Sequence, residues 1–149
     1  MSDKPKPITK EVLIDAPVSK VWKAITDKED MKQWYFDIAA FKPEVGYEFQ
    51  FTGPGEQYKQ YKQYRHICKI TEVIPNKKLS YSWRYEGYPG NSQVTFELFE
   101  EGDKTRLKLT HEGIESFGAD NPDFSRENGD AGWTYLIQTA IKVFLEKDV

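Results

Sequence analysis

The sequence is poor in cysteine, in long apolar runs and in net charge, and each shortage excludes a class of protein. Cys68 is the only cysteine, so a secreted fold held together by disulfides within the chain is excluded. No apolar run approaches the roughly 20 residues that span a bilayer, and the N-terminal stretch lacks the apolar segment of a signal peptide. These features predict a cytoplasmic protein without a membrane span.

The net charge of −3 is too small to attract nucleic acid or an anionic membrane over a long range. Two short helices are predicted close to the N-terminus, and the second mixes acidic with basic residues: Lys28, Glu29, Asp30 and Lys32. A helix that reads DNA needs mainly basic residues to reach phosphates and base edges. We therefore expect no nucleic acid partner.

Aromatic residues are abundant, at 15% of the chain, and many of them fall on predicted strands. Flat side chains on one face of a sheet can line a pocket, and each tyrosine adds a hydroxyl to the wall. The same rings can also fill an ordinary core and leave no usable space. The sequence alone leaves both interpretations open.

The hydrophobic pattern predicts one α+β domain over residues 1–149. After a flexible tail, residues 1–7, a strand is expected over residues 8–15, followed by the two short helices, with Asp27 as the N-cap of the second. From residue 38 onward, alternating residues predict about six strands; Leu79, Tyr81, Trp83 and Tyr85 form the clearest pattern. A long amphipathic helix is expected to begin between residues 121 and 130 and to end near Glu146.

Several short segments along nearly the whole chain carry a resemblance to a known group of proteins. They are Ala16-Pro17, Val21-Trp22, Trp34, Val45-Gly46, residues 70–75, residues 79–83, residues 94–98, residues 105–107, residues 109–113 and Gly132-Trp133 with Leu136. In this order the chain resembles the START-like (SRPBCC, helix-grip) superfamily and, within it, the family named after the activator of Hsp90 ATPase. The resemblance implies a single START-like domain, in which a curved antiparallel sheet of six to seven strands wraps around the C-terminal helix.

Members of this superfamily carry lipids, sterols or polyketides, act as cyclases, or stimulate a chaperone. The leading hypothesis is a cavity between the sheet and the C-terminal helix that binds a small hydrophobic or amphipathic molecule, such as a lipid, a sterol or a polyketide-like compound. The alternatives are a polyketide cyclase or aromatase-like enzyme and an Hsp90-type chaperone cofactor. Because fold membership does not choose among these roles, it stays open whether the protein is an enzyme. No cofactor is implied.

The residues expected to line the cavity are aromatic side chains on the inward face of the strands, with a few from the helices. They are Trp34, Phe49, Phe51, Tyr81, Trp83, Tyr85, Phe96, His111, Trp133 and Ile137. His111 is interpreted as a hydrogen-bonded residue rather than a proton-transfer group.

No catalytic residue and no metal site are predicted. Glu48, Glu72 and Glu97 alternate with apolar residues and should point outward, which leaves Tyr81, Tyr85 and Arg84 as candidates for cyclase chemistry. The set His66, Cys68 and His111 matches no zinc-binding spacing. Neither phosphate-binding glycine motif is present, so Gly53-Pro54-Gly55 is interpreted as a loop at the cavity rim.

Overall fold

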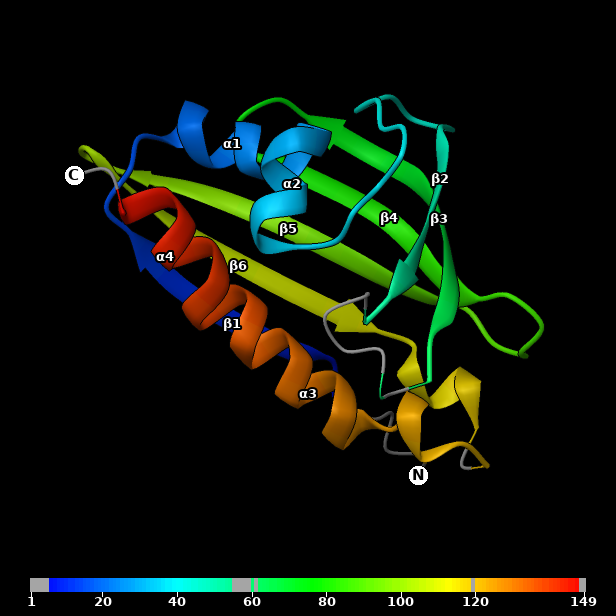
Figure 1. The fold of residues 1–149 in the computed structure, drawn as a ribbon. Coiled ribbons are helices and arrows are strands. Elements are labelled where there is room, and N and C mark those ends of the chain that lie inside the picture. The colour runs from blue at the N-terminus through cyan, green and yellow to red at the C-terminus, as the bar shows by residue number, and fades with distance from the viewer. Residues whose placement is uncertain (1–5, 55–59, 61, 119, 148–149) are drawn as a thin grey trace.

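A six-stranded antiparallel sheet and a long C-terminal helix form the two main layers of a computed structural model, which describes residues 6–54, 60, 62–118 and 120–147 (Figure 1). The strands are β1 (Ile8–Ile14), β2 (Glu48–Gly53), β3 (Tyr64–Ile74), β4 (Lys78–Tyr85), β5 (Ser92–Glu101) and β6 (Lys104–Glu112). Their order across the sheet is β1-β6-β5-β4-β3-β2. The first two strands therefore form the two edges, and the chain crosses the sheet between them.

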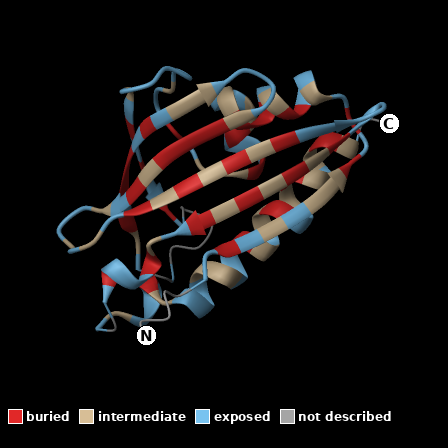
Figure 2. Ribbon diagram, turned by 180° about the vertical axis from the view of Figure 1, so that it is seen from behind, coloured by how far each residue is buried: buried red, intermediate tan, exposed pale blue. Residues whose placement is uncertain are grey.

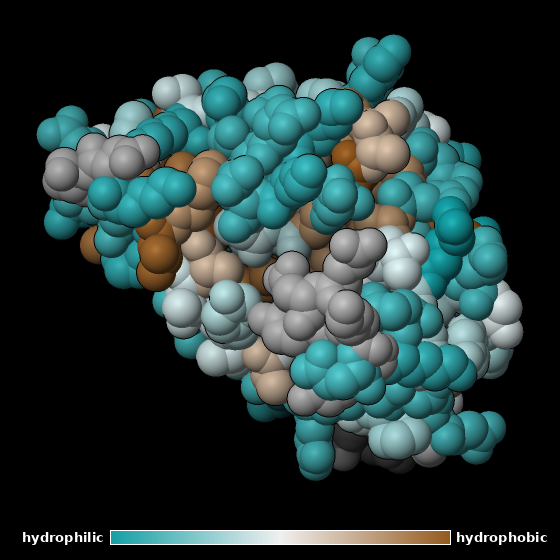
Figure 3. Space-filling view, viewed as in Figure 1, coloured by the Kyte–Doolittle hydropathy of each residue, from teal (hydrophilic) through white to brown (hydrophobic). Residues whose placement is uncertain are grey.

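The predicted alternation sets the inward face of the sheet. Leu79, Tyr81 and Trp83 are buried, whereas Arg84 is exposed, and Figure 2 shows the same banding along neighbouring strands. The register between β3 and β4 shifts between Ile70 and Glu72, an irregularity of the kind that bends a strand. The face seen in Figure 3 is mainly hydrophilic, with apolar residues along the long helix on the side that faces α2 and in a second patch at the upper right of the view.

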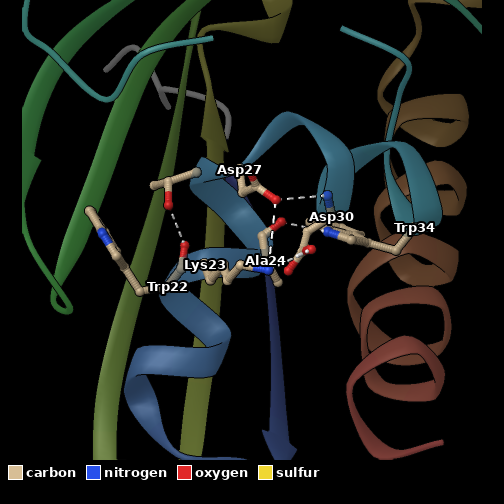
Figure 4. Close-up of polar contacts among 7 residues, drawn as sticks. Trp22, Lys23, Ala24, Asp27, Asp30 and Trp34 are labelled. Atoms are coloured by element: carbon tan, nitrogen blue, oxygen red, sulfur yellow. Dashed lines mark hydrogen bonds and ion pairs between the residues drawn. The ribbon is translucent and has the colours of Figure 1, made fainter.

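Two short helices, α1 (Val18–Thr26) and α2 (Lys28–Trp34), cover the sheet where the chain crosses it. The predicted N-cap is confirmed, because the carboxylate of Asp27 accepts a hydrogen bond from the Asp30 N–H at 3.3 Å (Figure 4). The indole N–H of Trp34 donates to the carbonyl of Ala24 at 2.7 Å and fixes one helix against the other.

The last helix has three parts: α3 (Arg126–Tyr135), a π-helical turn η4 (Leu136–Ala140) and α4 (Ile141–Glu146). It begins within the predicted interval and ends at the predicted residue. The Ser125 hydroxyl caps it by accepting from the Asn128 N–H at 3.2 Å. Two 3-10 turns, η2 (Ile114–Phe117) and η3 (Pro122–Phe124), join the sheet to this helix. In the described part of the chain, none of the helices has the length and apolar character needed to cross a bilayer.

The prediction of strands from residue 38 onward is wrong at its start. Residues 37–47, all of them described, contain no strand, and β2 begins at Glu48. Pro43 has no N–H for a strand ladder, and Gly46 turns the chain with a φ of +92°. In the predicted tail, residues 1–5 lie outside the described residues, while the carbonyls of Lys6 and Pro7 accept hydrogen bonds from Arg126.

Candidate functional site

A cavity of about 430 Å³ lies between the sheet and α3, and we call it the inner cavity. This volume falls within the range of small-molecule sites. Its walls are mainly apolar rings and one leucine: Phe36, Trp83, Tyr85, Phe124, Trp133 and Leu136. Polar side chains of Lys62, Tyr64, Asp123 and Asn128 stand at its rim.

Four of the predicted site residues line the inner cavity: Trp83, Tyr85, His111 and Trp133. Trp34 lies instead on a groove of about 580 Å³ between α2 and the long helix, which we call the outer groove. The other five are buried in the hydrophobic core and are not among the described residues that line either hollow: Phe49, Phe51, Tyr81, Phe96 and Ile137. Ligand binding by any of the ten residues stays a prediction.

The side chain of Tyr35 fills one end of the space between the sheet and the long helix. Its ring lies against Phe51, Phe96 and Trp133, and its hydroxyl is 2.7 Å from the hydroxyl of Tyr81. Burial raises the pKa of both phenols well above the usual value. The phenol of Tyr81 is therefore paired within the core rather than presented to a ligand.

His111 is held in a directional chain of hydrogen bonds behind the inner cavity. The indole N–H of Trp133 donates to Nδ1 of His111 at 2.9 Å, so Nδ1 carries no proton. The proton is then on Nε2, which donates to the Ser92 hydroxyl at 2.8 Å. That hydroxyl donates in turn to the carbonyl of Trp83 at 2.8 Å. The chain fixes a single neutral tautomer.

The surroundings of His111 favour a structural role in the wall of the inner cavity over proton transfer. Burial lowers its pKa to about 3, and both ring nitrogens already have partners inside the protein. The interpretation of His111 as a hydrogen-bonded residue is therefore confirmed. Its ring anchors Trp133, on the helix, to the sheet.

Trp83 differs from the other wall residues in its hydrogen bonding. Its side chain is 5% exposed, and Nε1 has no hydrogen-bond partner among the described residues. Burial raises the pKa of Tyr85 to about 12, and the Trp83 indole, as a nearby donor to the phenol, offsets part of that rise. The two side chains nevertheless do not meet hydrogen-bond geometry. A buried N–H without a partner is rare in proteins, because it gives up its hydrogen bond to water without replacement.

His66 lines the inner cavity, although it is not among the ligand contacts predicted from the sequence. Its Nδ1 donates to the carbonyl of Tyr64 at 3.0 Å, and its ring stacks on Phe51 with centroids 4.5 Å apart. Burial lowers its pKa to about 4, so the ring is neutral near pH 7. The close approach of Phe36 and His66 leaves no room for a side chain at Gly53, where an added Cβ would lie 2.9 Å from the Phe36 ring.

The rim of the inner cavity is a small polar network. The Tyr64 hydroxyl donates to the carboxylate of Asp123 at 2.5 Å and accepts from the Asn121 amide at 3.2 Å. Burial, together with the bond to Asp123, raises the pKa of Tyr64. The ammonium of Lys62 donates to the Tyr88 hydroxyl at 3.1 Å and lies over the ring of Tyr64.

The described residues do not assemble the groups considered for cyclase chemistry. Arg84 is exposed, and Tyr81 lies in the core. Asp123 is the one carboxylate among the described lining residues, and it comes from η3 rather than from a strand. In the part of the chain that the structure covers, no group of three His, Cys, Asp or Glu side chains could hold a metal ion.

Gly129 and Gly132, which are not among the predicted site residues, also face the inner cavity from α3. They stand three residues apart and align with Trp133 and Leu136 on one face of the helix. A pair of glycines on the apolar face of a helix is a readable signal, because glycine weakens a helix and needs a reason to be there. Gly53 and Pro54 both line the inner cavity, but the predicted loop is wrong at Gly53, which is the last residue of β2 and pairs with Tyr64. Gly55 lies outside the described residues.

Comparison with known proteins assigns the chain to a family. The model of the family described as "Activator of Hsp90 ATPase homolog 1-like protein" matches residues 15–146. No curated protein sequence was found to match the chain. Many solved structures share the fold.

Three of these structures illustrate the likeness. CV1439 from Chromobacterium violaceum is 19% identical with a TM-score of 0.79, over 95% of this chain and 98% of that one. BH1534 from Bacillus halodurans is 27% identical with a TM-score of 0.74, over 97% and 100% of the two chains. DynU16, from the dynemicin biosynthetic locus, is 20% identical with a TM-score of 0.73, over 96% of this chain but only 48% of that one.

The chain thus spans about half the length of DynU16. The predicted helix-grip α+β fold, with its curved antiparallel sheet and long C-terminal helix, is confirmed by the arrangement of the elements and by these neighbours. The family match covers most of the chain. The protein therefore belongs to the activator of Hsp90 ATPase homolog 1-like family, within the START-like (SRPBCC) superfamily.

Proposed function

We propose that the inner cavity binds a small, largely apolar molecule through a hydrogen bond from Trp83 Nε1 to an acceptor on that molecule. The observation that carries this proposal is the buried indole N–H of Trp83 without a partner among the described residues. Leaving a buried donor unsatisfied costs about 1–3 kcal/mol. A carbonyl, ether or hydroxyl oxygen of a ligand would remove that cost.

The walls and the rim define the ligand class. Aromatic rings around Trp83 suit a flat or apolar body, and the polar groups of Lys62, Tyr64 and Asp123 suit a polar end near solvent. A lipid-, sterol- or polyketide-like molecule has both parts. The relation to DynU16, whose gene lies in the dynemicin biosynthetic locus, is compatible with this class.

Binding without catalysis fits the chemistry of the walls better than turnover does. The neutral His111 uses both nitrogens within the protein, and Asp123 is already hydrogen-bonded by Tyr64. We place this binding in the cytoplasm, where the unpaired, buried Cys68 would stay reduced.

The test uses the four tryptophans as built-in reporters in ¹⁵N NMR spectra of the whole chain. Apolar acceptor-bearing compounds, namely fatty acid esters, sterols and aromatic ketones, are titrated one at a time. We expect the Trp83 indole signal to move downfield when a compound binds. The Trp22 indole, which is not among the described residues that line either hollow, should move much less.

A Trp83→Phe variant keeps an aromatic ring but removes the donor. It should lower the affinity for an acceptor-bearing ligand by about tenfold, as expected for one hydrogen bond. The proposal is wrong if no compound moves the Trp83 signal, or if the variant binds as tightly as the wild type.

A further inference from the structure

The inner cavity and the outer groove adjoin. Both are lined by Phe36, Pro54, Gly132 and Leu136. The two hollows therefore meet where the chain after α2 approaches the α3–η4 junction. Trp83 lies on the cavity side of this meeting point, and Val143 lies on the groove side.

Gly132 lies at this meeting point. A Cβ built on Gly132 meets no heavy atom of the described residues within 4 Å, and its backbone is helical rather than left-handed. Neither crowding nor backbone conformation therefore requires glycine here. Glycine in a helix costs about 1 kcal/mol relative to alanine, and at this exposed position it leaves empty space beside the helix.

The outer groove continues the apolar surface away from the cavity. Its floor along the long helix is formed by Leu136, Ala140, Val143 and Phe144. Val143 is 61% exposed, and the strip is visible between α2 and the long helix in Figure 3. An apolar strip that leads out of a ligand cavity is suited to an apolar chain.

We propose that the two hollows form one bent site for an elongated amphipathic ligand. Its acceptor-bearing head occupies the inner cavity, and an unbranched apolar chain passes Gly132 and lies in the outer groove. This inference rests on the proposed function, because the head is held by the Trp83 N–H. It adds the ligand's shape and assigns Gly132 and Val143 to recognition of the chain.

The test compares two probes with the same head: methyl phenyl ketone, which fits the inner cavity alone, and dodecyl phenyl ketone, whose chain needs the groove. Affinities are measured by titration calorimetry, and the Trp83 indole shift reports where the head binds. We expect the dodecyl ketone to bind wild-type protein at least tenfold more tightly. This ratio between the two affinities measures the contribution of the chain.

Two variants act on the path of the chain. Val143→Glu places a charge in the groove, and Gly132→Leu fills the passage; each should reduce the ratio to about one. Phe99→Glu is the matched control, since Phe99 is another exposed apolar residue but belongs to neither hollow, and it should leave the ratio unchanged. Thermal unfolding checks the fold of each variant, and Val143→Glu, at an exposed position, still decides if Gly132→Leu does not fold.

The outcomes separate the two proposals. If both ketones move the Trp83 signal but the ratio is the same in wild type, Val143→Glu and Phe99→Glu, the bent site is wrong and the cavity stands. If neither ketone moves the Trp83 signal, the proposed function fails, and the bent site fails with it. A ratio that falls only in the groove and passage variants supports both.

Discussion

The indole N–H of Trp133 donates to Nδ1 of His111 over 2.9 Å, whereas the neighbouring indole of Trp83 donates to no described residue. The two tryptophan rings are 5.7 Å apart, and both lie within 6 Å of the His111 ring. Two buried indoles in one wall therefore have opposite hydrogen-bonding states. One ties the helix to the sheet, and the other has no hydrogen-bond partner among the described residues.

Replacing each tryptophan by phenylalanine should separate these roles in the apo protein. Trp133→Phe leaves Nδ1 of His111 buried without a donor, which costs about 1–3 kcal/mol beyond the loss of packing. Trp83→Phe loses similar packing but removes a donor that has no partner among the described residues. We expect urea unfolding to show Trp133→Phe less stable than Trp83→Phe by that amount, and equal stabilities would contradict the hydrogen-bond assignment.

Stability should fall as the pH drops below neutral, because two buried histidines must stay neutral in the folded state. Their folded pKa values are lowered by burial to about 4 for His66 and about 3 for His111, against 6.5 when unfolded. Between the folded and the unfolded pKa values, the unfolded state binds more protons than the folded state. The free energy of unfolding therefore decreases as the pH falls from 6.5 towards 4. Each histidine should remove about 2 kcal/mol between pH 7 and pH 5.

Urea unfolding at both pH values measures this effect, and an asparagine variant of His111 isolates the contribution of that histidine. In His111→Asn the amide oxygen can still accept from Trp133, but the side chain does not titrate. The variant should therefore lose about 2 kcal/mol less than the wild type on acidification. A variant with the same pH dependence as the wild type would show that His111 is not buried in its neutral form.

Sequence patterns predict which side chains of a strand point inward better than they predict the empty space between the sheet and the long helix. The alternation through Tyr81, Trp83 and Tyr85 predicts which side chains point inward, because strand geometry is local. Whether an inward ring meets a cavity depends on what arrives from elsewhere in the chain. Tyr35 fills the space in front of Tyr81, whereas Trp83, although buried, lines the inner cavity.

The same limit applies to His111 and to the rim. Histidine is a residue type that can transfer protons. The hydrogen bonds of His111 to Trp133 and Ser92, which fix its neutral form, join distant parts of the chain and cannot be read from the sequence. The contact between Tyr64 and Asp123 spans a separation of 59 residues, and no spacing rule predicts it. The glycine pair Gly129 and Gly132 can be noticed in the sequence, but only the structure shows that this side of the helix faces the cavity.

Variants of Asp27 test the N-cap of α2, which lies in the segment that connects the two edge strands. Asp27→Ala removes the acceptor for the Asp30 N–H and should destabilise the protein by about 1 kcal/mol. Asp27→Asn keeps an acceptor oxygen at the same position and should cost much less. Urea unfolding of the two variants measures the difference (Figure 4), and an equal loss in both would point to charge rather than capping.

Glycine-to-alanine variants should have opposite effects at two positions. Gly132 has a helical backbone and open space around its Cβ position, so Gly132→Ala should stabilise the apo protein by about 1 kcal/mol. Gly90 has a φ of +101°, and its Cβ would lie 2.6 Å from the carbonyl oxygen of Ser116, so Gly90→Ala should destabilise it through both strain and a clash. Thermal unfolding measures both changes. If Gly132→Ala destabilised the apo protein, the space beside the helix would have to be filled by the protein itself, and the passage between the inner cavity and the outer groove would not exist.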